Sequence, residues 1–248
     1  MKKLLLIVAV LLASNVFANS GGAHLEPAQT NIRSKESLQN GAKYFMNYCS
    51  GCHSLQYQRY NRMAKDLELT KDEVKENLIF TDSKFPEHMT NTMDNAQVQE
   101  REWFHKAFPK DLTLIAKARG VDWLYNYLKG FYKDSSRPIG WNNTIFKGAS
   151  MPNALWELQG IQEAKFEEHE DEHGIVTHTF KGFKKVTEGS MSDEEFDETV
   201  RDIVNFLDYT AEPARLIRMG MAPWVLFFLV IFTMLAYLLK KNYFKDIH

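Results

Sequence analysis

Apolar residues recur through the middle of the chain at the spacing of amphipathic helices. Over residues 38–49 they fall at i, i+4, i+7, i+8 and i+11, which predicts a helix with one buried face. Three later segments indicate further helices, at residues 111–119, 121–131 and 196–211. The alternation typical of strands is weak, and the best candidate for a hairpin is residues 173–186. The pattern therefore predicts a mainly α fold.

Longer apolar runs mark the two ends of the chain. Two lysines precede an unbroken run from Leu4 to Leu12, and small or apolar residues follow it, as is typical of a secretory signal peptide. We expect cleavage ahead of Asn19. The predicted organisation is a signal peptide at residues 1–18, an exported domain at 19–220, a transmembrane helix at 221–239 and a cytoplasmic tail at 240–248.

The transmembrane prediction depends on the length of the second run. Met221 to Leu239 gives 19 residues without a charge, and at about 1.5 Å per residue such a helix nearly matches a hydrocarbon core of roughly 30 Å. Pro223 is then expected in its first turn, where the missing N–H does no harm. The alternative is a buried core helix, which the length and the lysines after residue 239 oppose. Because basic residues flank both ends, the signal peptide decides the orientation.

The charge of the exported part limits its partners. The whole chain has a formal charge of −2, and discounting the two N-terminal lysines and the net +2 of residues 240–248 leaves −6 on residues 19–220. An acidic domain of this kind argues against a nucleic-acid partner. Its roughly 200 residues are enough for one domain, and no repeat or low-complexity linker divides them.

Cys49 and Cys52 are the only cysteines, and with His53 they form a C-x-x-C-H motif. This spacing is typical of covalent haem attachment, because two thiols can form thioethers to the porphyrin while the next histidine binds the iron. The alternatives are a redox disulfide and half of a zinc site. Zinc would require more ligands than stand downstream, and a thioredoxin-like motif should follow a strand rather than a helix. The motif therefore predicts one covalently bound haem.

An electron-carrying haem needs a sixth ligand, and two of the ten methionines are the main candidates. Met191 already has a structural explanation, because it precedes Ser192 and Glu195, which fit a helix capping box. Met151 does not precede a helix cap, and the following Pro152 favours an extended loop. We therefore predict Met151 as the ligand, a thioether of the kind that raises the potential of His/Met haems.

An acidic stretch and a group of aromatic residues are two further candidates for a functional role. The acidic stretch from Glu163 to His173 either steers a basic cytochrome or is a solvated flank of the hairpin. Its histidines lack the spacing of a metal site. A group of aromatic residues is expected to pack in the core and the haem pocket: Trp123, Tyr125, Tyr127, Phe131 and Tyr132.

Longer motifs surround these residues. They are Gly41–Phe45 before Cys49–Leu55, Asp111–Gly120, Met151–Pro152 with Leu155–Glu157, and Ala211–Pro213 with Arg218–Gly220 before a single C-terminal span. In this order they resemble the cytochrome c1 family over nearly the whole mature chain. Members often have Pro-Pro-Asp-Leu-Ser where this chain has Pro-Lys-Asp-Leu-Thr at residues 109–113. That departure lies in a flanking loop and leaves the ligands intact.

The resemblance implies a cytochrome c-type haem domain with a C-terminal transmembrane helix. One haem c would be held by Cys49 and Cys52, with His53 and Met151 as axial ligands. Arg119 would pair with a haem propionate. The alternative for Arg119 is an ordinary cation at the end of a helix.

The resemblance also implies a function. Cytochrome c1 is the haem subunit of the cytochrome bc1 complex, and it passes electrons from the Rieske iron–sulfur protein to a soluble cytochrome c without being an enzyme on its own. Further expected partners are cytochrome b, the lipid bilayer and a second copy of the complex in a dimer. The haem domain would face the periplasm of a bacterium, with the C-terminus in the cytoplasm.

Two other functions stay open. An anchored c-type carrier of another respiratory assembly would usually have its anchor at the N-terminus. A haem peroxidase or gas sensor would need an open distal position, which a ligand at Met151 closes.

Overall fold

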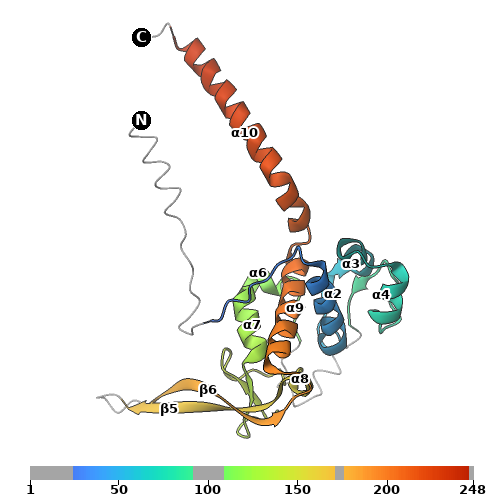
Figure 1. Ribbon diagram of the computed structural model, residues 1–248, viewed down its shortest axis with the longest axis vertical. Coiled ribbons are helices and arrows are strands. Elements are labelled where there is room, and N and C mark those ends of the chain that lie inside the picture. The colour runs from blue at the N-terminus through green and yellow to red at the C-terminus, as the bar shows by residue number, and fades with distance from the viewer. Residues whose placement is uncertain (1–24, 92–108, 171–175, 246–248) are drawn as a thin grey trace.

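The computed structural model describes residues 25–91, 109–170 and 176–245. A helical domain carries a long β-hairpin at one end and a single long helix at the other (Figure 1). The predicted signal peptide lies outside the described residues. The elements in chain order are α2 (Lys35–Tyr44), η1 (Phe45–Cys49), β1 (Leu55–Arg59), α3 (Tyr60–Leu67), α4 (Lys71–Asn77), β2 (His88–Met89), α6 (Ile115–Arg119), α7 (Val121–Lys129), β3 (Phe131–Lys133), β4 (Trp141–Asn143), α8 (Trp156–Gln159), β5 (Gly160–Glu170), β6 (Val176–Glu188), α9 (Asp193–Ala211) and α10 (Arg215–Tyr243).

The core of the domain is the close packing of α2 against α9, which lie side by side in Figure 1. At Gly41 the two backbones approach so closely that an added Cβ would lie 2.0 Å from the carbonyl oxygen of Asp202. Next to this contact the rings of Phe45 and Phe206 pack with centroids 5.7 Å apart. Glycine is needed at this position because no side chain fits between the helices.

Helix α9 confirms the prediction for residues 196–211. It begins with a capping box in which Ser192 and Glu195 each bond the backbone of the other. The Asp202 carboxylate accepts hydrogen bonds from Ser37 Oγ and Asn40 Nδ2 on α2, both at 2.6 Å. These bonds prevent α2 from sliding along the axis of α9 and hold the two helices in contact.

Three predicted helices differ in detail. The helix over residues 121–131 is shorter than expected, because α7 ends at Lys129 and Phe131 belongs to β3. The helix over residues 38–49 changes from α to π at Phe45, which separates α2 from η1. The helix over residues 111–119 begins only at Ile115. Asp111 accepts hydrogen bonds from the backbone N–H groups of Thr113 at 3.0 Å and Gln56 at 2.7 Å. These side-chain bonds hold the first residues in a turn and delay the helix.

The hairpin is longer than predicted and begins earlier. Strand β5 starts at Gly160 and pairs antiparallel with β6. The predicted range 173–186 therefore covers most of the second strand and none of the first. Gly160 has φ of 84°, and a Cβ there would meet the carbonyl oxygen of Thr187 at 2.3 Å. Two shorter two-stranded sheets pair β1 with β2 and β3 with β4. Helix still predominates among the described residues, which confirms the mainly α class.

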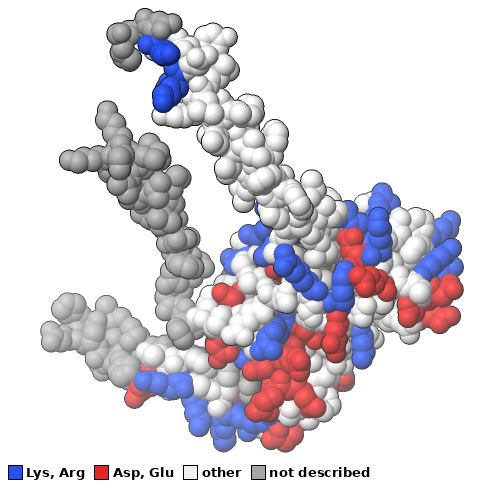
Figure 2. Space-filling model, turned by 45° about the horizontal axis from the view of Figure 1, so that its top comes forward, with Lys and Arg blue, Asp and Glu red and all other residues white. Residues whose placement is uncertain are grey.

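Helix α10 extends away from the domain and is largely exposed (Figure 1). Among the described helices it alone is long and apolar enough to cross a membrane, with 29 residues and a mean hydropathy of 2.3 in its most apolar window. Figure 2 shows an uncharged surface along its middle and basic side chains where it ends. Because the helix begins at Arg215, Pro223 lies in its interior, and the expectation of a first-turn proline was wrong. The carbonyl of Met219 therefore cannot receive the usual helical bond.

Candidate functional site

The C-x-x-C-H motif follows the π-helical turn at the end of α2. The backbone N–H of Ser50 donates to the carbonyl of Phe45 at 3.0 Å, and that of His53 donates to the carbonyl of Cys49 at 2.9 Å. Both cysteines are thiols rather than a disulfide in this described segment. Burial raises the pKa of the Cys49 thiol to about 12. The Cys49 thiol is therefore protonated.

The imidazole of His53 is held in one orientation by the backbone. Its Nδ1 lies 2.7 Å from the carbonyl oxygen of Lys110, so Nδ1–H donates to that oxygen. Burial lowers the pKa of His53, against the opposing effects of the Lys110 carbonyl and Asp111. The ring is therefore neutral, with the lone pair of Nε2 available. A carbonyl on one ring nitrogen is the usual support for a histidine that binds a metal through the other.

Further hydrogen bonds join the motif to two distant segments. The backbone N–H of Leu112 donates to the carbonyl of Ser54 at 2.9 Å. Asn91 Nδ2 donates to the carbonyl of Cys52 at 2.7 Å, and its backbone N–H donates to Ser54 Oγ at 2.9 Å. The motif is thus fixed to the chain ahead of α6 and to the segment that follows β2.

Met151 lies in the loop after β4, with its side chain half-buried. The hydroxyl of Tyr127 on α7 donates to Met151 Sδ at an O–S distance of 3.5 Å. Burial raises the pKa of Tyr127 to about 12, so the phenol stays protonated and remains a donor. Tyr127 packs against the core that contains Cys49. The described contacts place Met151 beside α7 and His53 beside the chain ahead of α6, without bringing the two side chains into direct contact.

Met191 has the structural surroundings expected from the sequence. The capping box of α9 begins at the next residue. The backbone N–H of Met191 donates to the carbonyl of Leu158 at 3.2 Å, and the Thr199 hydroxyl donates to its sulfur at 3.6 Å. Met191 therefore connects α8 to the start of α9, whereas Met151 lies on a loop beside the aromatic face of α7.

Arg119 ends α6 and is exposed. Its guanidinium lies over the ring of Trp123, 5.1 Å from the centroid. Trp123 in turn stacks on Tyr127, with centroids 4.9 Å apart and 10° between the planes. The structure thus places Arg119, Trp123, Tyr127 and Met151 in one column of side chains. The propionate role of Arg119 stays a prediction.

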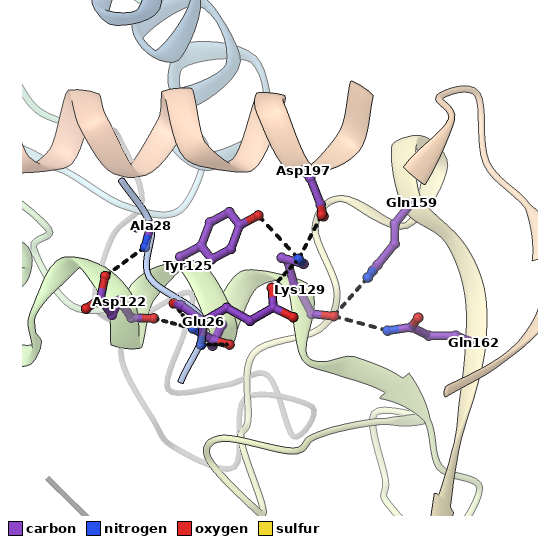
Figure 3. Close-up of polar contacts among 9 residues, drawn as sticks. Glu26, Ala28, Asp122, Tyr125, Lys129, Gln159, Gln162 and Asp197 are labelled. Atoms are coloured by element: carbon purple, nitrogen blue, oxygen red, sulfur yellow. Dashed lines mark hydrogen bonds and ion pairs between the residues drawn. The ribbon is translucent and has the colours of Figure 1, made fainter. Parts of the chain in front are cut away.

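A polar cluster on α7 had no signal in the sequence analysis (Figure 3). Lys129 Nζ lies 2.8 Å from a Glu26 oxygen, 2.9 Å from an Asp197 oxygen and 3.3 Å from the Tyr125 hydroxyl. Burial opposes the charge, but these hydrogen bonds outweigh it and raise the pKa of Lys129. The cluster joins the N-terminal segment, α7 and α9, three parts of the chain that are far apart in sequence.

The acidic stretch is only partly described. Residues 171–173 lie outside the described part, and side chains 168–170 are not described. Glu167 pairs with Lys181 at 2.5 Å across the hairpin. Figure 2 shows basic side chains along this hairpin, while the largest acidic group in that view lies on the body of the domain. The described part of the hairpin therefore carries mixed charge.

An apolar cavity of about 490 Å³ borders the Met151 loop. Its lining residues are Trp141, Pro152, Asn153, Ala154, Trp156 and Ile161. None of the C-x-x-C-H residues lines it. The cavity is therefore not the space between the two predicted axial ligands.

The donor set fits a covalently bound haem. Two thiols, a neutral imidazole with one free nitrogen and a half-buried thioether are the groups that such a haem requires. Among the described residues, no group of three or more His, Cys, Asp or Glu side chains is arranged to hold a metal ion.

Comparison with known proteins decides the family. The family model described as the cytochrome c1 family matches residues 30–173 and 180–247. The chain belongs to the cytochrome c1 family. Cytochrome c1 of Allochromatium vinosum is 48% identical, and the match covers 100% of both chains. A Nitrosomonas europaea protein named ammonia monooxygenase gamma subunit is 40% identical over 98% of this chain and 97% of that one. Cytochrome c1 of Rhodospirillum rubrum is 25% identical over 93% of this chain and 91% of that one.

Membership confirms the resemblance found in the sequence. It makes the chain a bacterial cytochrome c1, a haem-containing electron-transport subunit of the bc1 complex. Cytochrome c1 is a membrane-anchored part of that complex rather than an enzyme on its own, and α10 fits the anchor. The complex implies cytochrome b and a Rieske protein as partners.

Proposed function

We propose that this chain takes electrons one at a time from the Rieske protein and passes them to a soluble periplasmic cytochrome c. The observation that carries the proposal is the state of His53 beside the two cysteines. Its imidazole is neutral, its Nδ1 is occupied by the Lys110 carbonyl, and its Nε2 is left for an iron. The chain itself performs no proton transfer and breaks no bond.

The residues of the site would hold one haem c, which supplies one-electron redox chemistry when bound. Cys49 and Cys52 would form the two thioether links, and His53 and Met151 would be the axial ligands. An uncharged thioether favours the reduced iron and raises the potential. Arg119 would neutralise a propionate at the end of the aromatic column.

The topology follows from the two apolar ends of the sequence. Residues 1–18 would be removed on export, and residues 19–220 would form the periplasmic haem domain. Residues 221–239, within α10, would cross the cytoplasmic membrane, leaving residues 240–248 in the cytoplasm. The uncharged surface of α10 between the domain and the basic end supports this arrangement (Figure 2).

The assembly is expected to contain cytochrome b and the Rieske protein and to be a dimer of such units. The Nitrosomonas europaea relative raises a second candidate, because 40% identity over nearly the full length accompanies a name that refers to ammonia monooxygenase. The two candidate assemblies, a bc1 complex and a complex with ammonia monooxygenase, differ in the subunits that would be bound to this chain in its membrane.

Purification from that membrane through a C-terminal tag tests the partners. We expect cytochrome b and the Rieske protein to co-purify in detergent and quinol to reduce the haem. Recovery of ammonia monooxygenase subunits in their place would overturn the proposed assembly.

Acid–acetone extraction of the same sample tests the attachment. The colour should stay with the precipitated protein, because thioethers survive denaturation. Colour in the solvent would show that the haem is not covalently held.

A further inference from the structure

Tyr127 is held rigidly on α7 with its hydroxyl directed at the Met151 sulfur. One face of its ring stacks on Trp123, with centroids 4.9 Å apart. Phe131 packs edge-on against it, with centroids 5.0 Å apart and 69° between the planes. Two aromatic neighbours leave the ring little freedom to turn. The hydroxyl is therefore a fixed donor rather than a mobile one.

The loop that carries Met151 is tied to the same turn of α7. Asn143 Nδ2 donates to the backbone carbonyl of Tyr127 at 2.8 Å. The Asn143 Oδ1 accepts from the N–H groups of Ile145 at 2.9 Å and Phe146 at 3.0 Å, at the start of the loop. Asn143 is 1% exposed, so these bonds are sheltered from water.

Closer to Met151, a second set of bonds fixes the loop. Arg137 Nη2 donates to the carbonyl of Gly148 at 3.1 Å, and the Gly148 N–H donates to Asn142 Oδ1 at 2.8 Å. Gly148 has φ of 80°, a conformation that favours glycine. The backbone of the loop is thus set, and the freedom that remains lies in the three rotatable bonds of the methionine side chain.

We infer that Tyr127 is a positioning residue for the axial thioether: its hydroxyl holds Met151 Sδ in one rotamer and tunes the donation of that sulfur to the iron. The inference rests on the proposed function, because it requires Met151 to be a ligand. Hydrogen bonds to first-shell ligands are a recognised means by which a protein orients the ligand and tunes the metal.

The direction of the effect follows from electrostatics. An O–H group that donates to the sulfur withdraws electron density from it. This effect favours the reduced iron over the oxidised one, so loss of the hydroxyl should lower the reduction potential. Because the sulfur would also lose the contact that holds it in one rotamer, the thioether should become easier to displace.

The test compares Tyr127→Phe with Tyr125→Phe in the full-length protein, purified with its haem. Tyr127→Phe keeps the ring and its stacking and removes only the hydroxyl. Tyr125 lies on the same helix, and its hydroxyl is 3.3 Å from Lys129 Nζ, so it is a matched control that leaves Met151 untouched. The measurements are the reduction potential, the sulfur-to-iron absorption of the oxidised form, and the affinity of the oxidised form for imidazole, which competes with the thioether.

We expect Tyr127→Phe to lower the potential and to bind imidazole about two- to tenfold more tightly, the factor that one ordinary hydrogen bond provides. Tyr125→Phe should change neither. In a Met151→Leu background, adding Tyr127→Phe should leave imidazole affinity unchanged, because the sulfur that it acts on is gone. If Tyr127→Phe matches Tyr125→Phe in every measurement, the inference is overturned while the ligand assignment stands.

The Met151→Leu variant separates failure of the ligand assignment from failure of the inference. If that variant keeps the sulfur-to-iron absorption and the original imidazole affinity, Met151 is not the ligand, and this part of the proposed function fails first. If it loses both, the comparison of the two tyrosines decides the role of Tyr127.

Discussion

Replacing Gly41 with alanine perturbs the closest contact between α2 and α9. The new Cβ would lie 2.0 Å from the carbonyl oxygen of Asp202 and 2.8 Å from Cβ of Phe206. The first of these atoms belongs to the backbone of α9, and the second is the first atom of a side chain. Neither atom can be moved by a change of rotamer. The two helices must move apart.

The cost can be worked out from the contacts that this separation strains. Overpacking of a well-packed core typically costs about 1–3 kcal/mol. Losing one of the two hydrogen bonds that the Asp202 carboxylate accepts from α2 costs about 1.5–3 kcal/mol more. The better helix propensity of alanine returns about 1 kcal/mol. A net loss of about 3 kcal/mol would lower Tm by roughly 6–12 °C in a domain of this size.

Thermal unfolding followed by circular dichroism, on the full-length protein in detergent, checks this prediction. Gly220→Ala is the control, because Gly220 is exposed on α10 and a Cβ there would meet nothing within 4 Å. We expect the control to change Tm by less than about 2 °C, as surface substitutions usually do. Equal melting temperatures for the two variants would refute the close crossing of α2 and α9.

Three further predictions concern the ligand, acid stability and docking. Met151→Leu should remove the sulfur-to-iron absorption, lower the potential and stop quinol-driven electron flow, whereas Met191→Leu should cost under about 1.5 kcal/mol of stability; the opposite result in spectra and potential would exchange their roles. Hydrogen bonds from Ser192 hold the pKa of Glu195 below its ordinary value, so their stabilisation is present above the unfolded-state pKa and is lost as the pH falls through the folded-state pKa. In Glu195→Ala, Tm measured against pH should no longer show this loss of stability at acid pH. A pH dependence of Tm equal to that of the parent protein would contradict the prediction. Stopped-flow transfer to a basic soluble cytochrome should slow as salt rises, because about 0.1 M salt limits the reach of surface charges to roughly 10 Å; a rate that salt leaves unchanged would count against electrostatic docking.

The features that sequence predicted are those whose causes are local. Helix α9 combines a long apolar period with the capping box of Ser192 and Glu195, so its start could be predicted to within a few residues. The C-x-x-C-H motif carries its chemistry within five residues. Met151 was preferred over Met191 for a local reason as well, because Met191 precedes a cap.

The features that sequence missed depend on pairing over long distances. Strand β5 contains charged residues among its apolar ones, and it becomes a strand because β6 pairs with it along its whole length. The π-helical turn of η1 has no simple signal, since its apolar spacing is also that of an α-helix. The Tyr127–Met151 contact joins residues 24 positions apart through a folded loop.

Helix α7 shows why such contacts matter together. Asp122, Tyr125 and Lys129 follow the spacing of one helix face, and Trp123 and Tyr127 follow that of another. The first group holds the N-terminal segment: Asp122 Oδ1 accepts from the backbone N–H of Ala28 at 2.7 Å, and Lys129 pairs with Glu26 (Figure 3). In the second group, Tyr127 donates to Met151 and Trp123 stacks on Tyr127. Because one short helix carries both groups, the contacts that fasten the N-terminal segment also fix the position from which the Tyr127 hydroxyl reaches the sulfur.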